Sequence, residues 1–261
     1  MKALCLIRKE PHYRRQAFES GLQRVGFKLT DKLTPAGPED WLVIWNRKTG
    51  AEELQANDWE RRGGTVIVTE NGCLQKVDKT RYAISVHGHN GSGWFPVGTE
   101  DRFGPLGFEV KPWRKSGDEI VIRAQRGIGS SLMASPPLWA EKLAAKMRAN
   151  STLPVRVIQH PGNFAPKVAP VKDLARAFAL VTWCSSMGVL ALVEGIPVFY
   201  AAPHWICERG GAPLSAFPEC NTGAGRGLAL HRMSHGQWGV DEIATGEPFA
   251  RIIEHRKEAV W

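Results

Sequence analysis

Three polar segments in the second half of the chain each follow an apolar run, and their residue types suit the binding of a phosphate group. They are Gln125-Arg126-Gly127 after the run 119–123, His160 after 155–159, and Ser185-Ser186 after 178–183. Arginine supplies a fixed positive charge, and glycine lets the backbone approach an anion closely. Serine hydroxyls and the N–H groups at the start of a helix also bind anions. Because parallel strands end at one edge of an α/β sheet, we expect the three segments to share one ligand.

The stretch 177–202 carries the strongest of these signals. An apolar strand is followed by a Ser-Ser-x-Gly turn at 185–188, a short helix over 189–194, and a Gly-x-Pro-Val that leads into another strand. Such a turn presents backbone N–H groups at a helix start, which predicts a site for a phosphorylated or nucleotide ligand. The same pattern is also ordinary wiring between two buried strands, and many such units bind nothing.

Strands and helices alternate in both halves of the chain, and these elements must position the polar segments. In the first half we expect strands at 3–7, 27–29, 41–45, 65–69 and 83–86, with helices at 14–25 and 52–61. In the second half we expect the three strands above and a helix at 137–149. This alternation predicts an α/β fold with two Rossmann-like domains facing a cleft. We place the domains at 1–110 and 111–245, and expect a C-terminal helix at 246–261 to cross back to the first domain.

Composition and charge limit the classes of partner that the chain can bind and the cellular compartment in which it works. The chain has 261 residues and a formal net charge of +8, which favours a polyanion such as nucleic acid, or an anionic nucleotide sugar. Its five cysteines are scattered and form no CxxC pair, which indicates reduced thiols, a cytoplasmic location and no metal site. No secretory signal is visible, and the serines and glycine inside 177–202 argue against a membrane span.

Candidate bases for an acceptor hydroxyl lie in the first half. Glu70 follows the predicted strand 65–69, and His87 and His89 lie in the glycine-rich segment HGHNGSGWFP. Asp101 is a fourth candidate. A base must come within hydrogen-bond reach of the proton it removes, and we rank Glu70 first because its strand end should face the cleft. Each histidine is equally well explained by a hydrogen bond that ties the loop.

Aromatic residues offer a second kind of contact. Ten tryptophans are present, and Trp94, Trp113 and Trp205 lie in segments rich in glycine and proline. Tryptophans in loops can stack on bases or sugars, although about half of them are explained as well by the closing of hydrophobic edges.

The segments QRGIGS, VRVIQHPG and VTWCSSMGVLALVEGIPVF resemble the donor-binding domain of GT-B glycosyltransferases. The likeness is to the capsule-polysaccharide Kdo-transferase-like group and to small phage-encoded DNA-modifying glycosyltransferases. In the first half, PHYRRQAFESGLQRVGF and GGTVIVTENGCL are similar to the acceptor-side domain of that group. The resemblance covers about residues 1–200 and implies a metal-independent glycosyltransferase that uses a nucleotide sugar and no cofactor.

The resemblance also implies a role for each polar segment. The donor-binding residues that it implies are Gln125, Arg126, Gly127, Gly129, Ser130, His160, Ser185, Ser186, Gly188 and Glu194. The glycine loop would line the pyrophosphate, His160 would reach the phosphate or the sugar, and the serines would cap the phosphate. Many GT-B enzymes hold the donor ribose with a glutamate where this chain has Leu190, and Glu194, one turn later, is the expected substitute.

The acceptor is predicted from the net charge and from the resemblance together. The positive charge and the phage-encoded relatives favour double-stranded DNA, with glucose passing from UDP-glucose to a hydroxymethylated pyrimidine such as 5-hydroxymethylcytosine. On that hypothesis the location is the host cytoplasm, and no membrane is involved. The alternative is a glycosyltransferase that acts on a lipid-linked, surface or capsule glycan. A nucleotide-binding protein without transferase activity, and a GT-B-shaped protein with another chemistry such as epimerisation, also stay open.

Overall fold

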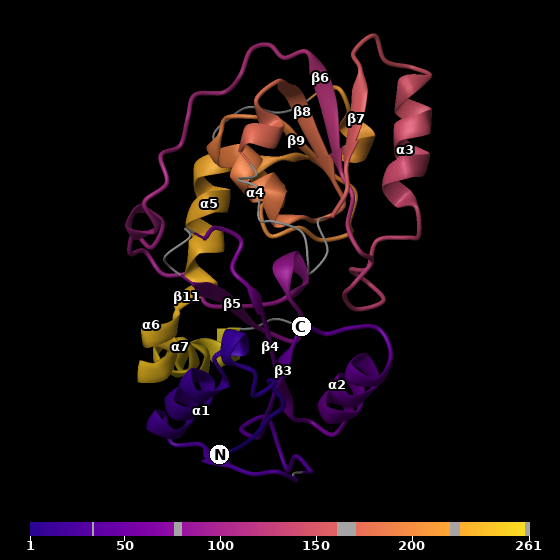
Figure 1. Ribbon diagram of the computed structural model, residues 1–261. Helices are drawn as coiled ribbons and strands as arrows, with labels where there is room; N and C mark the ends of the chain where they lie inside the picture. Colours follow the sequence, from indigo (N-terminus) through magenta and orange to yellow (C-terminus); the bar gives the residue numbers. More distant parts are fainter. Residues whose placement is uncertain (33, 76–79, 161–170, 220–224, 259–261) are drawn as a thin grey trace. The chain divides into compact units, whose positions relative to one another are not determined.

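The computed structural model describes residues 1–32, 34–75, 80–160, 171–219 and 225–258 (Figure 1). The chain divides into two compact units. The first consists of Met1–Glu100, Gly129–Ser131 and Ser234–Trp261, and the second of Asp101–Ile128 and Leu132–Met233. Each unit is built around one β-sheet.

The first unit contains a six-stranded sheet with the strand order β11-β5-β4-β3-β1-β2. Its strands are β1 (Lys2–Cys5), β2 (Lys28–Leu29), β3 (Trp41–Trp45), β4 (Thr65–Asn71), β5 (Arg81–Val86) and β11 (Gln237–Gly239). The strands β2, β1, β3 and β4 are parallel, whereas β5 is antiparallel to β4 and β11 is antiparallel to β5. The direction of β5 decides which loops share an edge of this sheet.

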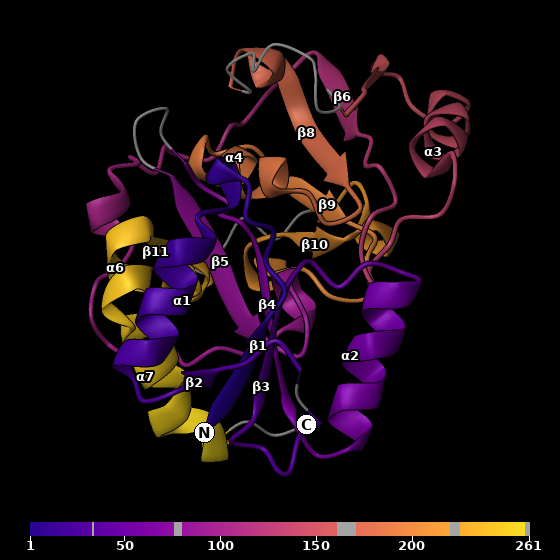
Figure 2. The same ribbon diagram turned by 60° about the horizontal axis from the view of Figure 1, so that its bottom comes forward.

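Helices cover both faces of the first sheet, because its central strands are apolar on both sides. The helices α1 (Arg15–Arg24), α6 (Val240–Thr245) and α7 (Glu247–His255) lie together on one face, and α2 (Ala51–Arg61) lies on the other (Figure 2). Side chains alternate along a strand, so Trp41 and Val43 pack on the α1 side while Leu42 and Ile44 pack with Trp59 of α2.

The second unit contains a five-stranded sheet with the order β10-β9-β8-β6-β7, and all of its pairings are parallel. Its strands are β6 (Glu119–Arg123), β7 (Val155–Ile158), β8 (Ala177–Thr182), β9 (Val198–Tyr200) and β10 (Ala212–Pro213). The helices are α3 (Trp139–Arg148), α4 (Ser186–Val193) and α5 (Gly225–His235), whose last two residues are grouped with the first unit. The apolar side of α3, which carries Ala140, Ala144 and Met147, packs on β7 and β6.

The predicted strands at 41–45 and 119–123 are confirmed residue for residue. One difference bears on the site: β4 continues to Asn71, so Glu70 lies inside the strand and not after it. The elements α5, β11 and α6 were not predicted, since α5 contains two glycines, which disfavour a helix, and β11 has only three residues. Across the described residues, no helix has the length and apolar character needed to cross a membrane.

Candidate functional site

The loop that follows β6 is joined to the turn that follows β8. The side-chain carbonyl of Gln125 accepts a hydrogen bond from the backbone N–H of Cys184 at 2.7 Å. Its amide nitrogen lies 3.6 Å from the Cys184 sulfur. Because β6 and β8 are neighbouring parallel strands, both segments leave the sheet at its carboxyl edge. Gln125 therefore holds the turn that precedes α4 beside the glycine loop, as expected for segments that share a ligand.

Arg126 and His160 lie near each other at the same edge. Partial burial and the guanidinium groups of Arg126 and Arg123 lower the pKa of His160. Both Arg126 and His160 are exposed, so an anion from solvent can reach them. At neutral pH the pair offers one permanent positive charge and one neutral imidazole that can donate a hydrogen bond.

The turn at Ser185 has the geometry of a helix cap. The Ser185 hydroxyl accepts a hydrogen bond from the N–H of Met187 at 3.2 Å, and its own N–H donates to the Thr182 hydroxyl at 2.9 Å. Ser186 is the first residue of α4 and is exposed. The start of α4 is therefore ordered and accessible, which suits an anion site.

Gly188 lets α4 pack closely against the ring of Trp205. It is buried, and a Cβ atom at this position would come within 2.7 Å of the Trp205 ring. Trp205 is itself fully buried. Of the two roles considered for the loop tryptophans, Trp205 therefore closes a hydrophobic region and does not stack on a ligand, because a closely packed indole has no open face.

The rest of the glycine loop is held by a different set of contacts. Gly127 has a φ of 65°, a conformation that favours glycine. The carbonyl of Gly129 accepts hydrogen bonds from the N–H of Thr49 at 2.7 Å and from its hydroxyl at 2.8 Å. Ser130 is buried, and Gly129–Ser131 belongs to the first unit. The start of α2 thus fixes the end of this loop.

Glu194 lies at the opposite end of α4 from Ser185. It caps the carboxyl end of the helix, and its carboxylate accepts a hydrogen bond from Lys111 at 2.5 Å. A helix of eight residues spans about 12 Å. The structure therefore does not bring Glu194 together with the phosphate-binding candidates.

Glu70 is held by neutral amides near the carboxyl end of β4. The Asn46 side chain donates to one carboxylate oxygen at 2.5 Å, and the N–H of Asn71 donates to the other at 2.8 Å. Burial raises the pKa of Glu70, and this effect exceeds the lowering by the hydrogen bonds and by the charge of Lys48. A carboxylate with a raised pKa binds a proton more tightly, which is what a general base requires.

Asn46 is a site residue that the sequence reasoning missed. It directly follows β3, is buried, and has a φ of 61°, which asparagine tolerates better than most residues. Its amide nitrogen serves Glu70, while its Oδ1 atom is buried without a hydrogen-bond partner among the described residues. The available signal was a polar residue immediately after the predicted strand 41–45.

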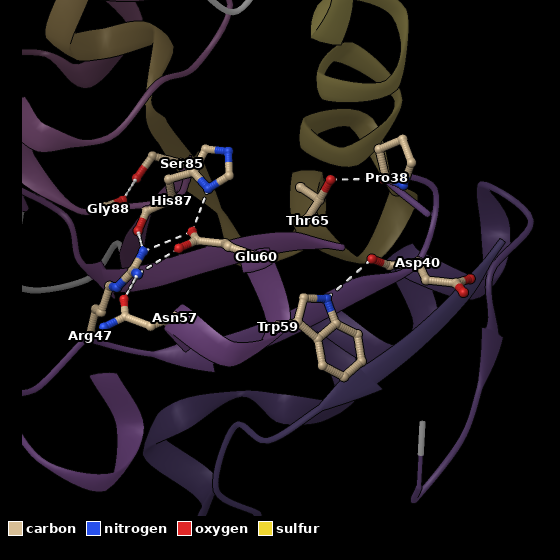
Figure 3. A network of polar contacts seen from close by, with 10 residues as sticks. All are labelled: Pro38, Asp40, Arg47, Asn57, Trp59, Glu60, Thr65, Ser85, His87 and Gly88. Atoms are coloured by element: carbon tan, nitrogen blue, oxygen red, sulfur yellow. Dashed lines mark hydrogen bonds and ion pairs between the residues drawn. The ribbon is translucent and has the colours of Figure 1, made fainter. Parts of the chain in front are cut away.

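His87 takes part in a charged network with residues of the loop after β3 and of α2 (Figure 3). Its Nδ1 atom contacts the carboxylate of Glu60, which accepts two hydrogen bonds from Arg47 at 2.8 and 2.6 Å. Arg47 also donates to Asn57 and to the carbonyl of His87. Burial alone would raise the pKa of Glu60, but the hydrogen bonds from His87 and Arg47 outweigh burial and lower it.

Strand direction separates His87 from Glu70. Because β5 is antiparallel to β4, Val86 pairs with Ile67, and the N–H of His87 donates to the carbonyl of Val66 at 2.8 Å. Four residues of a strand span about 13 Å. His87 therefore lies towards the amino end of β4 and Glu70 at its carboxyl end, so the two do not form one catalytic pair within this unit.

The other candidate bases have local explanations. Burial lowers the pKa of His89 to about 4, and its Nδ1 atom has no hydrogen-bond partner among the described residues. Such an imidazole is neutral and weakly basic at neutral pH. Asp101 accepts hydrogen bonds from the N–H groups of Phe103 at 3.0 Å and Gly104 at 2.9 Å, which closes a turn. In the part of the chain that the structure describes, no cluster of three His, Cys, Asp or Glu side chains is placed to hold a metal ion.

Comparison with known proteins finds solved structures that resemble this chain, and two of them are Kdo transferases. No family model matches the chain, and no curated protein matches it in sequence. The solved structure of the KpsC beta Kdo 2,4 transferase of Thermosulfurimonas dismutans is 13% identical, covers 93% of this chain and 98% of its own, and has a TM-score of 0.52. The KpsC beta Kdo 2,7 transferase of the same organism is 13% identical, covers 95% and 99%, and has a TM-score of 0.55.

At 13% sequence identity, the structural similarity establishes the fold alone. The chain has an α/β fold of the GT-B type with two Rossmann-like units, as the sequence predicted.

Proposed function

We propose that this chain is a glycosyltransferase that moves a sugar from a nucleotide donor to a hydroxyl group of a surface or capsule glycan. The fold that it shares with two Kdo transferases supports this reaction class and this acceptor class over DNA. The observation that carries the proposal is the bond between Gln125 and Cys184, which brings the glycine loop and the start of α4 together at one edge of the second sheet.

The proposed donor site uses Arg126, His160 and the start of α4. In the transfer, the acceptor oxygen forms a bond to the anomeric carbon while the bond from that carbon to the phosphate oxygen breaks. The leaving phosphate takes the electron pair and gains negative charge. Arg126 and the N–H groups of the capped helix stabilise that charge, and no metal is required.

The proposed base is Glu70. It accepts the proton of the acceptor hydroxyl, and its raised pKa makes it suited to this step near neutral pH. Asn46 and Asn71 orient its carboxylate through the two hydrogen bonds described above.

A second candidate acceptor is DNA that carries hydroxymethylated pyrimidines. The net charge of +8 favours it, because lysine and arginine contacts to phosphates dominate binding to DNA. Binding of this kind weakens steeply as salt is added, whereas binding of a glycan that carries only one or a few carboxylates, such as a Kdo-terminated oligosaccharide, weakens far less.

A matrix of donors and acceptors tests the function. Nucleotide-activated Kdo and UDP-glucose are each incubated with a Kdo-terminated oligosaccharide and with hydroxymethylated duplex DNA, and products are identified by mass spectrometry. We expect a mass gain on the oligosaccharide that persists in EDTA. A gain on DNA alone would replace the glycan with DNA as acceptor, and no gain in any combination would refute the proposal.

Two variants test the site. Arg126→Ala should abolish most of the transfer by weakening donor binding, whereas Arg209→Ala, an exposed arginine elsewhere in the second unit, should leave it intact. Equal activity of both variants would move the donor site elsewhere.

A further inference from the structure

Arg123 is a charged residue at the carboxyl end of β6, and the donor site described above gives it no role. It pairs in register with Thr182 of the neighbouring parallel strand β8. The residues just before these two, Ile122 and Val181, belong to the core that packs under α3. Because side chains alternate along a strand, Arg123 and Thr182 both lie on the opposite face of the sheet.

That face also carries the start of α4. The Thr182 hydroxyl accepts a hydrogen bond from the N–H of Ser185 at 2.9 Å, and a Cβ atom on Gly188 would lie 3.3 Å from the Thr182 methyl group. The first turn of α4 therefore packs on Thr182. Since neighbouring strands are about 4.8 Å apart, the base of the Arg123 side chain lies one strand spacing away, beside this helix start.

The Arg123 guanidinium extends from β6 to the end of β7. Its Nη1 atom donates to the backbone carbonyl of Gln159 at 2.8 Å. Gln159 directly precedes His160, and the pKa of His160 is lowered by burial and then by the charges of Arg126 and Arg123. Arg123 therefore lies at the same edge of the sheet as the two residues already assigned to the donor.

Most of the N–H groups of Arg123 are available to a ligand. A guanidinium has five of them, and the bond to Gln159 is the one hydrogen bond that Arg123 forms with the described residues. No Arg123 nitrogen is among the buried polar atoms that lack a partner, and the side chain is half-buried. The edge formed by Nε and Nη2 is thus intact and open to solvent, and this edge can bind a phosphate through two parallel bonds.

The charge of Arg123 is only partly balanced by the protein. Partial burial lowers its pKa, and the carboxylate of Asp173 opposes this shift from beyond ion-pair distance, since Arg123 forms no ion pair within the described part of the chain. An arginine stays charged at neutral pH even so. A partly desolvated cation with open donors gains free energy when an anion binds to it.

We propose that Arg123 is a second phosphate-binding guanidinium of the donor site, and that this site takes a nucleoside diphosphate. The inference rests on the proposed function, because it concerns the donor of that reaction. Arg123 binds the donor through Nε and Nη2 while Nη1 stays on the Gln159 carbonyl. Together with Arg126 and the start of α4, it supplies positive charge for two phosphate groups, where one guanidinium would suit a single phosphate.

Isothermal titration calorimetry on the full chain tests the inference with UDP against UMP and CDP against CMP. Two pairs are used because the inference concerns the phosphates and not the base. We expect the diphosphate of the preferred base to bind about tenfold or more tighter than its monophosphate. Arg123→Met should weaken the diphosphate about tenfold and the monophosphate about threefold or less, since hydrogen bonds to charged groups are the stronger ones.

The matched control is Arg148→Met. Arg148 also donates to a backbone carbonyl of β7, that of Val155 at 2.9 Å, but at the amino end of the strand. Its replacement removes a bond of the same kind and should leave nucleotide binding unchanged. Thermal unfolding of every variant confirms that it is folded at the titration temperature. Should Arg123→Met not fold, Arg123→Gln replaces it with the same expectation, because glutamine keeps a neutral donor for the Gln159 carbonyl.

The outcomes separate this inference from the proposed function. Equal fractional losses of diphosphate and monophosphate in Arg123→Met would mean that Arg123 only holds the end of β7, and would overturn the inference. Nucleotide binding that Arg126→Ala weakens and Arg123→Met leaves unchanged would overturn the inference alone, as would a monophosphate that binds as tightly as its diphosphate. Absence of binding by all four nucleotides would overturn the inference together with the proposed donor site.

Discussion

Two glutamates in the first unit, Glu60 and Glu70, are both withdrawn from water, yet their pKa values move in opposite directions. Glu60 accepts hydrogen bonds from a guanidinium and an imidazole, and its pKa is lowered. Glu70 accepts hydrogen bonds from amides, and its pKa is raised. Burial alone therefore does not decide the role of a carboxylate. Partners with positive charge make Glu60 part of the framework, whereas neutral partners leave Glu70 able to take up a proton.

The largest expected effect is a loss of stability when the ion pair between Arg47 and Glu60 is broken. Arg47→Met removes the cation that pairs with Glu60, and removing one partner of a buried ion pair typically costs about 3–5 kcal/mol of unfolding free energy. The pair is partly exposed, so the low end of this range is expected. Urea denaturation measures the change. Arg62→Met, which breaks an exposed pair with Asp58, should cost far less, and equal losses would refute the framework role.

The next largest expected effect is a loss of transfer rate when Glu70 is replaced. Glu70→Gln keeps the shape of the side chain but cannot accept a proton, so transfer should fall about 100-fold or more while the protein stays folded. Initial rates with the best donor and acceptor measure this loss. The partner experiment is Glu60→Gln, which should reduce stability and leave the rate per folded molecule nearly unchanged. A reversal of the two phenotypes would exchange the roles of the two residues.

The pH dependence of stability should separate the two glutamates by sign. The pKa of Glu60 is lowered by folding, so its stabilising contribution is present above the unfolded pKa and is lost as the pH falls through the folded pKa. The pKa of Glu70 is raised, so its ionisation reduces stability at neutral pH, and this cost disappears as the pH falls through the folded pKa.

Urea denaturation of the wild type, Glu60→Gln and Glu70→Gln between neutral pH and about pH 4 measures both contributions. Acidification should shrink the stability advantage of the wild type over Glu60→Gln. The same change should improve the stability of the wild type relative to Glu70→Gln. Parallel curves for the two variants would show that the two pKa values do not diverge.

The smallest expected effect is a shift in the pH dependence of the rate when Asn46 is replaced. Asn46→Gly removes the amide that donates to Glu70 and keeps a residue suited to a φ of 61°. Loss of that hydrogen bond disfavours the carboxylate, so the acid limb of the pH–rate profile should move to higher pH by up to about one unit. A rate loss without any movement of the limb would mean that Asn46 only supports the fold.

Local patterns carried much of the fold and part of the site. The runs that form β3 and β6 were located from their apolar residues, and the segments at Gln125 and Ser185 were expected at one edge because consecutive parallel strands end there. The positions of His87 and His89 relative to Glu70 could not be predicted from such patterns, because they depend on β5 running antiparallel to β4. A strand pattern contains no information on the direction of its neighbour.

By itself, the sequence determined where most of the strands lie, that the fold is of the α/β type, and which polar residues follow three strands of the second half. Only the tertiary structure decided that Arg47 meets Glu60, that Asn46 meets Glu70, and that Trp205 is closed in the core. The physical reason is that the two properties depend on neighbours of different kinds, along the chain in one case and in space in the other. Secondary structure follows from residues within a few positions of one another, whereas the charge state of a carboxylate depends on groups a few ångströms away that the fold brings in from elsewhere in the chain.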